Sequence, residues 1–221
     1  MVAPKLTLKS QNQTVNESDT ITLLCVATGD PNPNITWTKG STVLQQTSIS
    51  NYTISSAAKD DSGTYTCTAQ VTVPGLSVQP DNYQVTLTVR HKPVITSLTG
   101  NQTVNDGTDV LFFCQADAVP TPTAYNWFKN GVPIPSGSSA DFVNSGQQLT
   151  VRSVKNDSAG RYSCSGTNTM GTGEEKSTFL IVQCKEEKNN LTFSTQRQNK
   201  RCGVGAESRR LAKVAGNVNR K

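Results

Sequence analysis

Histidine is almost absent from this chain, because His91 is the only one among its 221 residues. One histidine cannot supply a base to two repeated units, and the sequence has neither a Gly-rich phosphate loop nor an HExxH motif. We therefore expect no enzyme, no metal site and no cofactor. Long apolar runs are also missing, since no stretch approaches the roughly 18 residues that a membrane-spanning helix needs.

The amino terminus lacks the apolar core of a signal peptide. If the protein works outside the cell, we expect this sequence to be a trimmed or incomplete form. Any membrane contact would then depend on an anchor that this sequence does not contain.

Positive charge is scarce in the body of the chain and concentrated at its carboxyl end. Residues 1–183 hold 11 Lys and Arg against 13 Asp and Glu, whereas residues 184–221 hold 10 against 3. The net charge of +5 therefore belongs to the tail, and we expect no nucleic-acid partner. The tail shows no strand pattern, so we expect it to be disordered. Its basic residues are a weak candidate for binding heparan sulfate or acidic lipid, and a merely solvated tail is the simpler interpretation.

The six cysteines form no closely spaced pairs among the first four, and no CxxC motif occurs. Zinc sites and redox centres usually need such pairs, so disulfides in an oxidising compartment are the better interpretation. They predict an extracellular protein. Cys184 and Cys202 are left over in the tail, where a small loop, intermolecular bonds and free thiols all stay open for them.

The sequence repeats itself with a period of 89 to 97 residues. In each half a cysteine is followed 12 or 13 residues later by a tryptophan, and then by Gly-x-Tyr-x-Cys. Apolar and polar residues alternate around these landmarks, which is the period of strands with one buried face. The landmarks are Cys25, Trp37, Gly63, Tyr65 and Cys67 in the first half and Cys114, Trp127, Gly160, Tyr162 and Cys164 in the second.

These landmarks resemble those of the immunoglobulin superfamily over about residues 3–183. The second half also contains Cys164-Ser-Gly-Thr-Asn-Thr-Met-Gly171, which is similar to the C-x-A/G-x-N-x-x-G ending of I-set domains; the first half lacks it. The resemblance implies an all-β fold of two tandem immunoglobulin-like antiparallel β-sandwiches, with domains at residues 3–90 and 91–183 and the tail at 184–221. It also implies disulfides Cys25–Cys67 and Cys114–Cys164, with Trp37, Tyr65, Trp127 and Tyr162 packed in the cores.

Two details of the repeat need separate expectations. Residues 89–93 are expected to be a short spacer between the domains, with His91 exposed in it rather than serving as a pH switch. Ser158 stands where the first half has Asp61. Members of the family often pair that aspartate with a basic side chain, and no arginine partner for Asp61 is evident.

Asn-x-Ser/Thr sequons are frequent, and none has proline in the middle position. They support a secretory route with N-linked glycosylation, although chance alone supplies several in a chain so rich in Asn, Ser and Thr. Two of them lie too close together for both to be occupied comfortably, namely Asn12 and Asn16. The full set of acceptors is Asn12, Asn16, Asn34, Asn51, Asn101, Asn156 and Asn190.

The last two strands of the first half, and the loop between them at residues 71–82, contain no sequon. This loop is more apolar than a solvated turn needs, and adhesion proteins of the immunoglobulin family often recognise partners with that sheet and loop. We therefore predict a partner-binding element here, against the alternative that the apolar side chains fold back onto the domain edge. The residues concerned are Val73, Pro74, Leu76 and Val78.

The resemblance implies a cell-surface adhesion or recognition module that binds a protein on a cell or in the matrix, with a second copy of itself as one candidate. Each contact would be weak, and clustering would supply avidity. Two alternatives stay open: the ligand-binding ectodomain of a receptor, such as a receptor tyrosine kinase, and a secreted decoy or innate recognition isoform.

Overall fold

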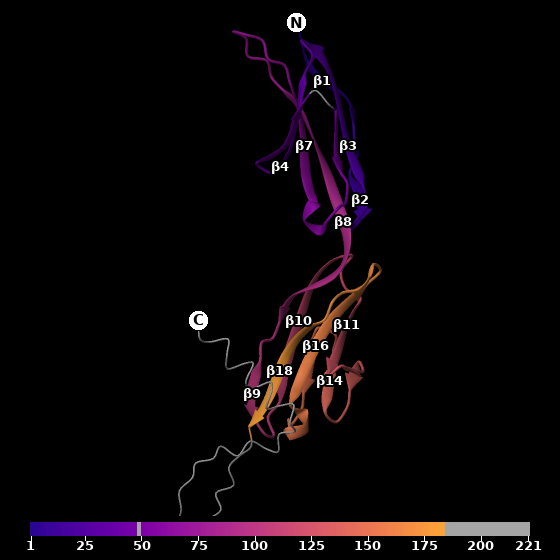
Figure 1. The fold of residues 1–221 in the computed structure, drawn as a ribbon, viewed down its shortest axis with the longest axis vertical. Coiled ribbons are helices and arrows are strands. Elements are labelled where there is room, and N and C mark those ends of the chain that lie inside the picture. The colour runs from indigo at the N-terminus through magenta and orange to yellow at the C-terminus, as the bar shows by residue number, and fades with distance from the viewer. Residues whose placement is uncertain (48–49, 184–221) are drawn as a thin grey trace, which may run out of the picture. The chain divides into compact units, whose positions relative to one another are not determined.

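The computed structural model describes residues 1–47 and 50–183 (Figure 1). The chain divides into two units, domain 1 (Met1–His91) and domain 2, which begins at Lys92. Each domain is a β-sandwich of two sheets, which confirms the predicted all-β fold of two tandem sandwiches. Residues 184–221 lie outside the described part, and with them the tail predictions and three predicted site residues, Cys184, Asn190 and Cys202.

In domain 1 one sheet has the strand order β1-β3-β6 and the other the order β5-β4-β7-β8-β2. Neighbouring strands are antiparallel, except that β2 runs parallel to β8. A short 3₁₀ turn, η1, precedes β7. The elements are β1 (Val2–Lys9), β2 (Gln13–Asn16), β3 (Ile21–Asp30), β4 (Asn34–Lys39), β5 (Thr42–Thr47), β6 (Asn51–Ile54), η1 (Lys59–Asp61), β7 (Gly63–Gln70) and β8 (Asp81–Leu98).

Domain 2 repeats this plan with sheets β13-β14-β15-β10-β8 and β12-β11-β16-β18-β9. Here β9 runs parallel to β18, as β2 does to β8 in domain 1, and the short β17 pairs with β16. The elements are β9 (Gln102–Asn105), β10 (Val110–Val119), β11 (Ala124–Lys129), β12 (Val132–Ile134), β13 (Gly137–Ser138), β14 (Phe142–Asn144), β15 (Gln148–Val151), η2 (Asn156–Ser158), β16 (Gly160–Asn168), β17 (Gly171–Thr172) and β18 (Lys176–Gln183).

Strand β8 belongs to both domains, because its first part pairs with β7 and its last part joins the sheet of β10. The expected spacer at residues 89–93 therefore lies inside a strand. Alternate side chains stay buried through it, from Val89 to His91 and Pro93. The expectation of an exposed His91 was wrong: its side chain is 3% exposed, because the two-residue period of the strand continues through the spacer.

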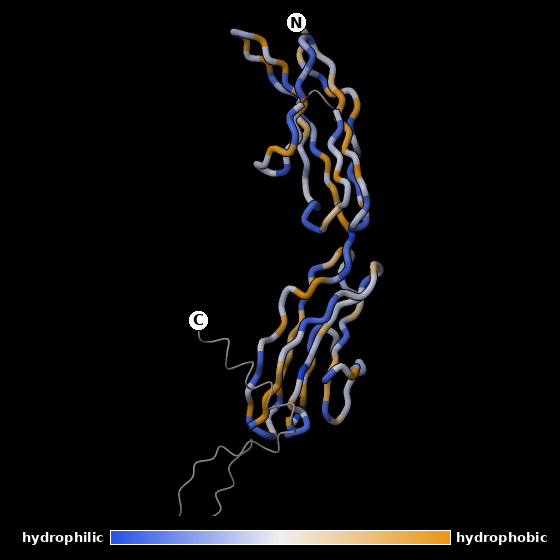
Figure 2. The backbone as a smooth tube through the Cα atoms, in the orientation of Figure 1, coloured by the Kyte–Doolittle hydropathy of each residue, from blue (hydrophilic) through white to orange (hydrophobic). Residues whose placement is uncertain are grey.

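Each domain has its own apolar core, built from the alternating positions that the sequence indicated (Figure 2). The predicted disulfides Cys25–Cys67 and Cys114–Cys164 are both formed, each joining the two sheets of one domain with 6.5 Å between the Cα atoms. The tryptophans lie against them and are 1% exposed. Trp127 Nε1 donates a hydrogen bond to the Gly146 carbonyl at 2.8 Å, while Trp37 Nε1 has no partner among residues 1–47 and 50–183.

A tyrosine fixes the turn before the second cysteine in each domain. The hydroxyl of Tyr65 donates to the Asp61 carbonyl, and that of Tyr162 to the Ser158 carbonyl, both at 2.8 Å. Burial, with the negative charge of Asp61 nearby, raises the pKa of Tyr65 to about 12. Burial also raises the pKa of Tyr162 well above its usual range. Both phenols therefore stay protonated donors through the neutral and mildly alkaline range.

The side chains of Asp61 and Ser158 perform the same task despite their different chemistry. The Asp61 carboxylate accepts a hydrogen bond from the Ala58 amide at 2.8 Å, and the Ser158 hydroxyl accepts one from the Lys155 amide at 3.0 Å. Each bond closes its 3₁₀ turn. The replacement of Asp61 by a serine in the second repeat thus keeps the turn without needing an ion pair.

Candidate recognition surface

The loop between β7 and β8 projects from domain 1 as a narrow finger, at the end of the sandwich that holds the amino terminus (Figure 1). Its tip is a tight turn in which the Leu76 amide donates to the Val73 carbonyl at 3.1 Å. Pro74 fixes the φ angle at the first central position of the turn, and Gly75 adopts the positive φ of 76° that the second central position requires. Leu76 is 52% exposed, Pro74 is exposed, and Val73 and Val78 are half-buried.

The base of the finger is anchored by two neighbouring residues. Val71 is buried, with 1% of its surface exposed, and its side chain lies close to Gly29 on β3. The side-chain amide of Gln70 donates to the Val71 carbonyl at 2.9 Å and to the Val78 carbonyl at 3.1 Å, which links the two arms of the finger. The apolar tip is therefore presented on a base held by hydrogen bonds.

Domain 2 turns sharply where domain 1 extends its finger. In domain 2 the residue four positions after the second cysteine is Asn168, whose side chain donates to the Pro120 carbonyl at 2.8 Å and accepts from the Met170 amide at 2.9 Å. Domain 1 has the apolar Val71 at the same place, which can make neither bond. The I-set-like ending thus encodes a tight hairpin, and its absence from domain 1 accompanies the longer loop.

A polar surface adjoins the finger on the outer side of the β5-β4-β7-β8 sheet. On these strands the side chains that face away from the core alternate with buried ones, such as Ile35 and Trp37 on β4. None of the outward side chains below carries a charge, and most are threonines or glutamines. We call this surface the threonine face; it consists of Asn34, Thr36, Thr38, Val43, Gln46, Thr64, Thr66, Thr68, Gln70, Asn82, Gln84 and Thr86.

The register of the strands places these side chains in rows. Thr36 on β4 lies opposite Gln46 on one side and Thr68 on the other, and Thr68 lies opposite Asn82. Opposed side chains on one sheet face are about 4.5–5.5 Å apart at their Cβ atoms. The threonine face is therefore a continuous uncharged surface, and sequence reasoning missed it because strand register decides which residues share it.

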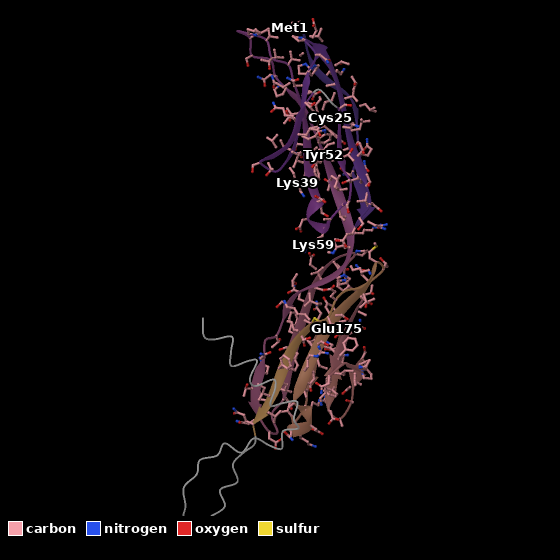
Figure 3. The ribbon with its side chains drawn as sticks, in the orientation of Figure 1. Met1, Cys25, Lys39, Tyr52, Lys59 and Glu175 are labelled. Carbon is pink, nitrogen blue, oxygen red and sulfur yellow. A yellow bond between two sulfur atoms is a disulfide. The ribbon has the colours of Figure 1, made fainter. Side chains whose placement is uncertain are left out.

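Two charged groups at the ends of this sheet are occupied by their own domain. Lys39, labelled in Figure 3, donates to the Asp60 carbonyl and places its ammonium 5.3 Å from the centre of the Tyr65 ring. The Asp81 carboxylate accepts a hydrogen bond from the Leu6 amide at 2.8 Å. Because the centres of protein interfaces are depleted in charge, this arrangement suits protein recognition.

Metal-ligating side chains do not cluster in the part of the chain that the structure describes. No group of three or more His, Cys, Asp or Glu side chains comes together over residues 1–47 and 50–183. Within the same range no helix has the length and apolar character for crossing a membrane.

The predicted glycosylation acceptors in the described range are all exposed. Two of them also have a structural role: the Asn12 side-chain oxygen accepts from the Thr86 amide at 2.9 Å, and that of Asn101 accepts from the Phe179 amide at 3.0 Å. Both begin the identical pentapeptide Asn-Gln-Thr-Val-Asn, a repeat that our sequence analysis did not use. In both domains the last four residues of the pentapeptide form an edge strand, β2 or β9, that pairs in parallel with its neighbour.

The family model of the immunoglobulin domain matches two segments of this chain, residues 3–70 and 92–168. The chain belongs to the immunoglobulin superfamily. Among curated relatives, limbic system-associated membrane protein from Gallus gallus is 33% identical over 174 residues, which cover 77% of this chain and 50% of the relative. Protein turtle homolog B from Rattus norvegicus is 33% identical over 181 residues, covering 76% of this chain and 13% of the relative. The chain thus spans half or less of the length of these relatives.

Among solved structures, the complex of Dpr2 Ig1-Ig2 with DIP-Theta Ig1-Ig3 contains a similar chain with a TM-score of 0.56 and 26% identity, covering 82% of this chain and 65% of that one. Sidekick-1 immunoglobulin domains 1-5 gives a TM-score of 0.53 at 22% identity, covering 86% of this chain and 40% of that one, and supports the fold alone. The two immunoglobulin domains and their disulfides agree with the resemblance seen in the sequence.

Proposed function

We propose that this chain is an extracellular recognition module of the adhesion type, which binds a protein partner through the finger and the threonine face of domain 1. The proposal depends on the finger and the threonine face being adjacent, since the finger connects β7 to β8 and both strands belong to the face. An exposed apolar tip beside an uncharged polar sheet offers a partner both buried apolar area and hydrogen-bonding groups.

The comparisons support a protein partner. One similar solved chain occurs in a complex between two immunoglobulin proteins, Dpr2 and DIP-Theta, and the similar relative from Gallus gallus is called a membrane protein. Each sandwich contains its own disulfide, which suits an oxidising extracellular location.

A second copy of the chain is the partner that we propose first. Two uncharged faces can meet without the like-charge repulsion that a charged self-contact would suffer. The exposed apolar tip is small, so each contact would be weak and would depend on many copies acting together on a cell surface.

Bead aggregation tests this proposal. Beads coated with the glycosylated, secreted full chain are mixed with control beads of another colour, and clumping of coated beads alone indicates self-binding. Leu76→Asp should abolish clumping, because it places a charge on the apolar tip without disturbing a buried side chain. Clumping that survives this change would remove the finger from the proposal, and beads that stay dispersed at high coating density would favour the receptor alternative with a different ligand.

The threonine face is tested separately with an added glycan. Gln84→Asn creates a glycosylation acceptor with Thr86 in the middle of the face, and Gln148→Asn creates one with Thr150 on the outer side of domain 2. Mass spectrometry verifies that each new site is occupied. We expect clumping to be lost with Gln84→Asn and kept with Gln148→Asn, and equal clumping would refute a role for the face.

A further inference from the structure

One sequon, that of Asn34, lies on the threonine face itself. Asn34 begins β4, where buried Ile35 and Trp37 alternate with outward Thr36. Asn34 is exposed, and its side chain lies on the same outward face of β4 as that of Thr36, the residue that completes its sequon. A glycan attached here would therefore stand on the outer surface of the sheet rather than at a remote loop.

The strand register brings Asn34 next to the base of the finger. Asn34 lies opposite Gln70 on β7, and Gln70 is the residue whose side chain links the two arms of the finger. Opposed residues on one sheet face are about 5 Å apart at their Cβ atoms, a distance far smaller than a branched glycan. Although they are 36 positions apart in the sequence, the acceptor and the finger base are thus neighbours.

The other sequons of domain 1 do not have this position. Asn51 begins β6, in the opposite sheet. Asn16 lies on the edge strand β2 opposite Arg90, toward the end of β8 that is far from the finger. Asn12 precedes β2 and accepts a hydrogen bond from the Thr86 amide at the edge of the threonine face, but it does not adjoin the finger. Among these acceptors, Asn34 alone adjoins both the finger and the rows of threonines.

We propose that Asn34 is a glycan-controlled gate, at which an N-linked glycan covers part of the threonine face and weakens the docking of a second copy of the chain on it. The unglycosylated form presents the face and binds its partner more tightly. This inference rests on the proposed function, since it assigns a regulatory modification to the same surface. Occupancy of a single acceptor would then set the adhesive strength of an otherwise unchanged protein.

The first part of the test is peptide mass spectrometry of the secreted full chain, which must find a glycan on Asn34. The second part compares bead clumping for Asn34→Gln with that for Asn51→Gln, a matched control in the opposite sheet. Thr36→Val removes the same acceptor while keeping Asn34, and Thr36→Ser, which changes the same position of the face but keeps the sequon, is its control. Unchanged thermal unfolding verifies that each variant is folded.

We expect Asn34→Gln and Thr36→Val to clump at a coating density at least about tenfold lower than unmodified protein or Asn51→Gln does. An unoccupied Asn34, or occupied Asn34 with equal clumping of all variants, would overturn the gate. If Leu76→Asp still abolished clumping in the latter case, the proposed function would stand without it. Failure of every variant to clump, Asn34→Gln included, would overturn both.

Discussion

Replacement of Asn168 should show that one buried amide holds the hairpin of domain 2. The side chain is 6% exposed and makes two hydrogen bonds, to the Pro120 carbonyl at 2.8 Å and from the Met170 amide at 2.9 Å. Each bond contributes a net of about 0.5–1.5 kcal/mol, so Asn168→Ala should lower the free energy of unfolding of domain 2 by about 2 kcal/mol. This corresponds to a roughly 30-fold increase in the population of the unfolded domain.

Hydrogen exchange measured by mass spectrometry can locate this effect. Core amides of β11 and β16 exchange through global opening of domain 2, so Asn168→Ala should accelerate them by about 30-fold. Amides of β4 in domain 1 serve as an internal reference and should not change. The control Thr172→Ala removes an exposed hydroxyl contact with Thr167 in the same hairpin, and should cost less than about 0.5 kcal/mol.

Asn168→Asp separates the two bonds, because it keeps an acceptor for the Met170 amide and loses the donor to the Pro120 carbonyl. We expect it to be destabilising as well, since its carboxylate would face that carbonyl oxygen. An acceleration below about twofold for Asn168→Ala, or an equal acceleration in both domains, would refute the assignment of the hairpin to this amide.

Two further changes test close packing and the tyrosine turn. Gly173→Ala would place a Cβ atom 1.7 Å from the Pro93 carbonyl oxygen, so domain 2 should lose about 1–3 kcal/mol in the same exchange measurement, while Gly100→Ala, with open space around it, should not. Tyr65→Phe should lower the stability of domain 1 by about 1 kcal/mol at pH 7, through loss of the bond to the Asp61 carbonyl. Because the folded pKa of Tyr65 is raised to about 12 from 10, its protonated phenol stabilises domain 1 below pH 10, and this contribution is lost as the pH rises through 12. Urea unfolding at pH 8 and pH 11 should therefore show a smaller alkaline loss for Tyr65→Phe, and an equal loss would contradict this pKa.

The fold could be predicted because its landmarks are local and repeated. A cysteine, a tryptophan and a Gly-x-Tyr-x-Cys ending occur twice, and each has one physical role in a sandwich core. The structure forms both disulfides and buries both Trp37 and Trp127. The prediction of an exposed His91 failed because it relied on the charged, proline-containing composition of the spacer. In the structure this stretch is part of β8, so buried and exposed side chains alternate along it.

The proposed recognition surface could be predicted only in part. The finger is one continuous segment, so its apolar residues were evident from the sequence. The threonine face is assembled from four strands, and only their register shows that Thr36, Thr68 and Asn82 form one row. The same limit hid the relation of Asn34 to Gln70, because the two residues are 36 positions apart in the sequence and only the register of β4 and β7 brings them together.

The parallel edge pairs have a mechanical consequence. In domain 1 the strand β2 enters from the amino-terminal side and runs alongside β8, which leaves the domain at the other end, so tension along the chain pulls the two strands past each other. The hydrogen bonds between them, together with the Asn12 bond to the Thr86 amide, then carry the load at the same time and cannot be broken one by one. Asn101 and Phe179 repeat this arrangement between β9 and β18, so in each domain a pull along the chain is met by a parallel strand pair loaded in shear.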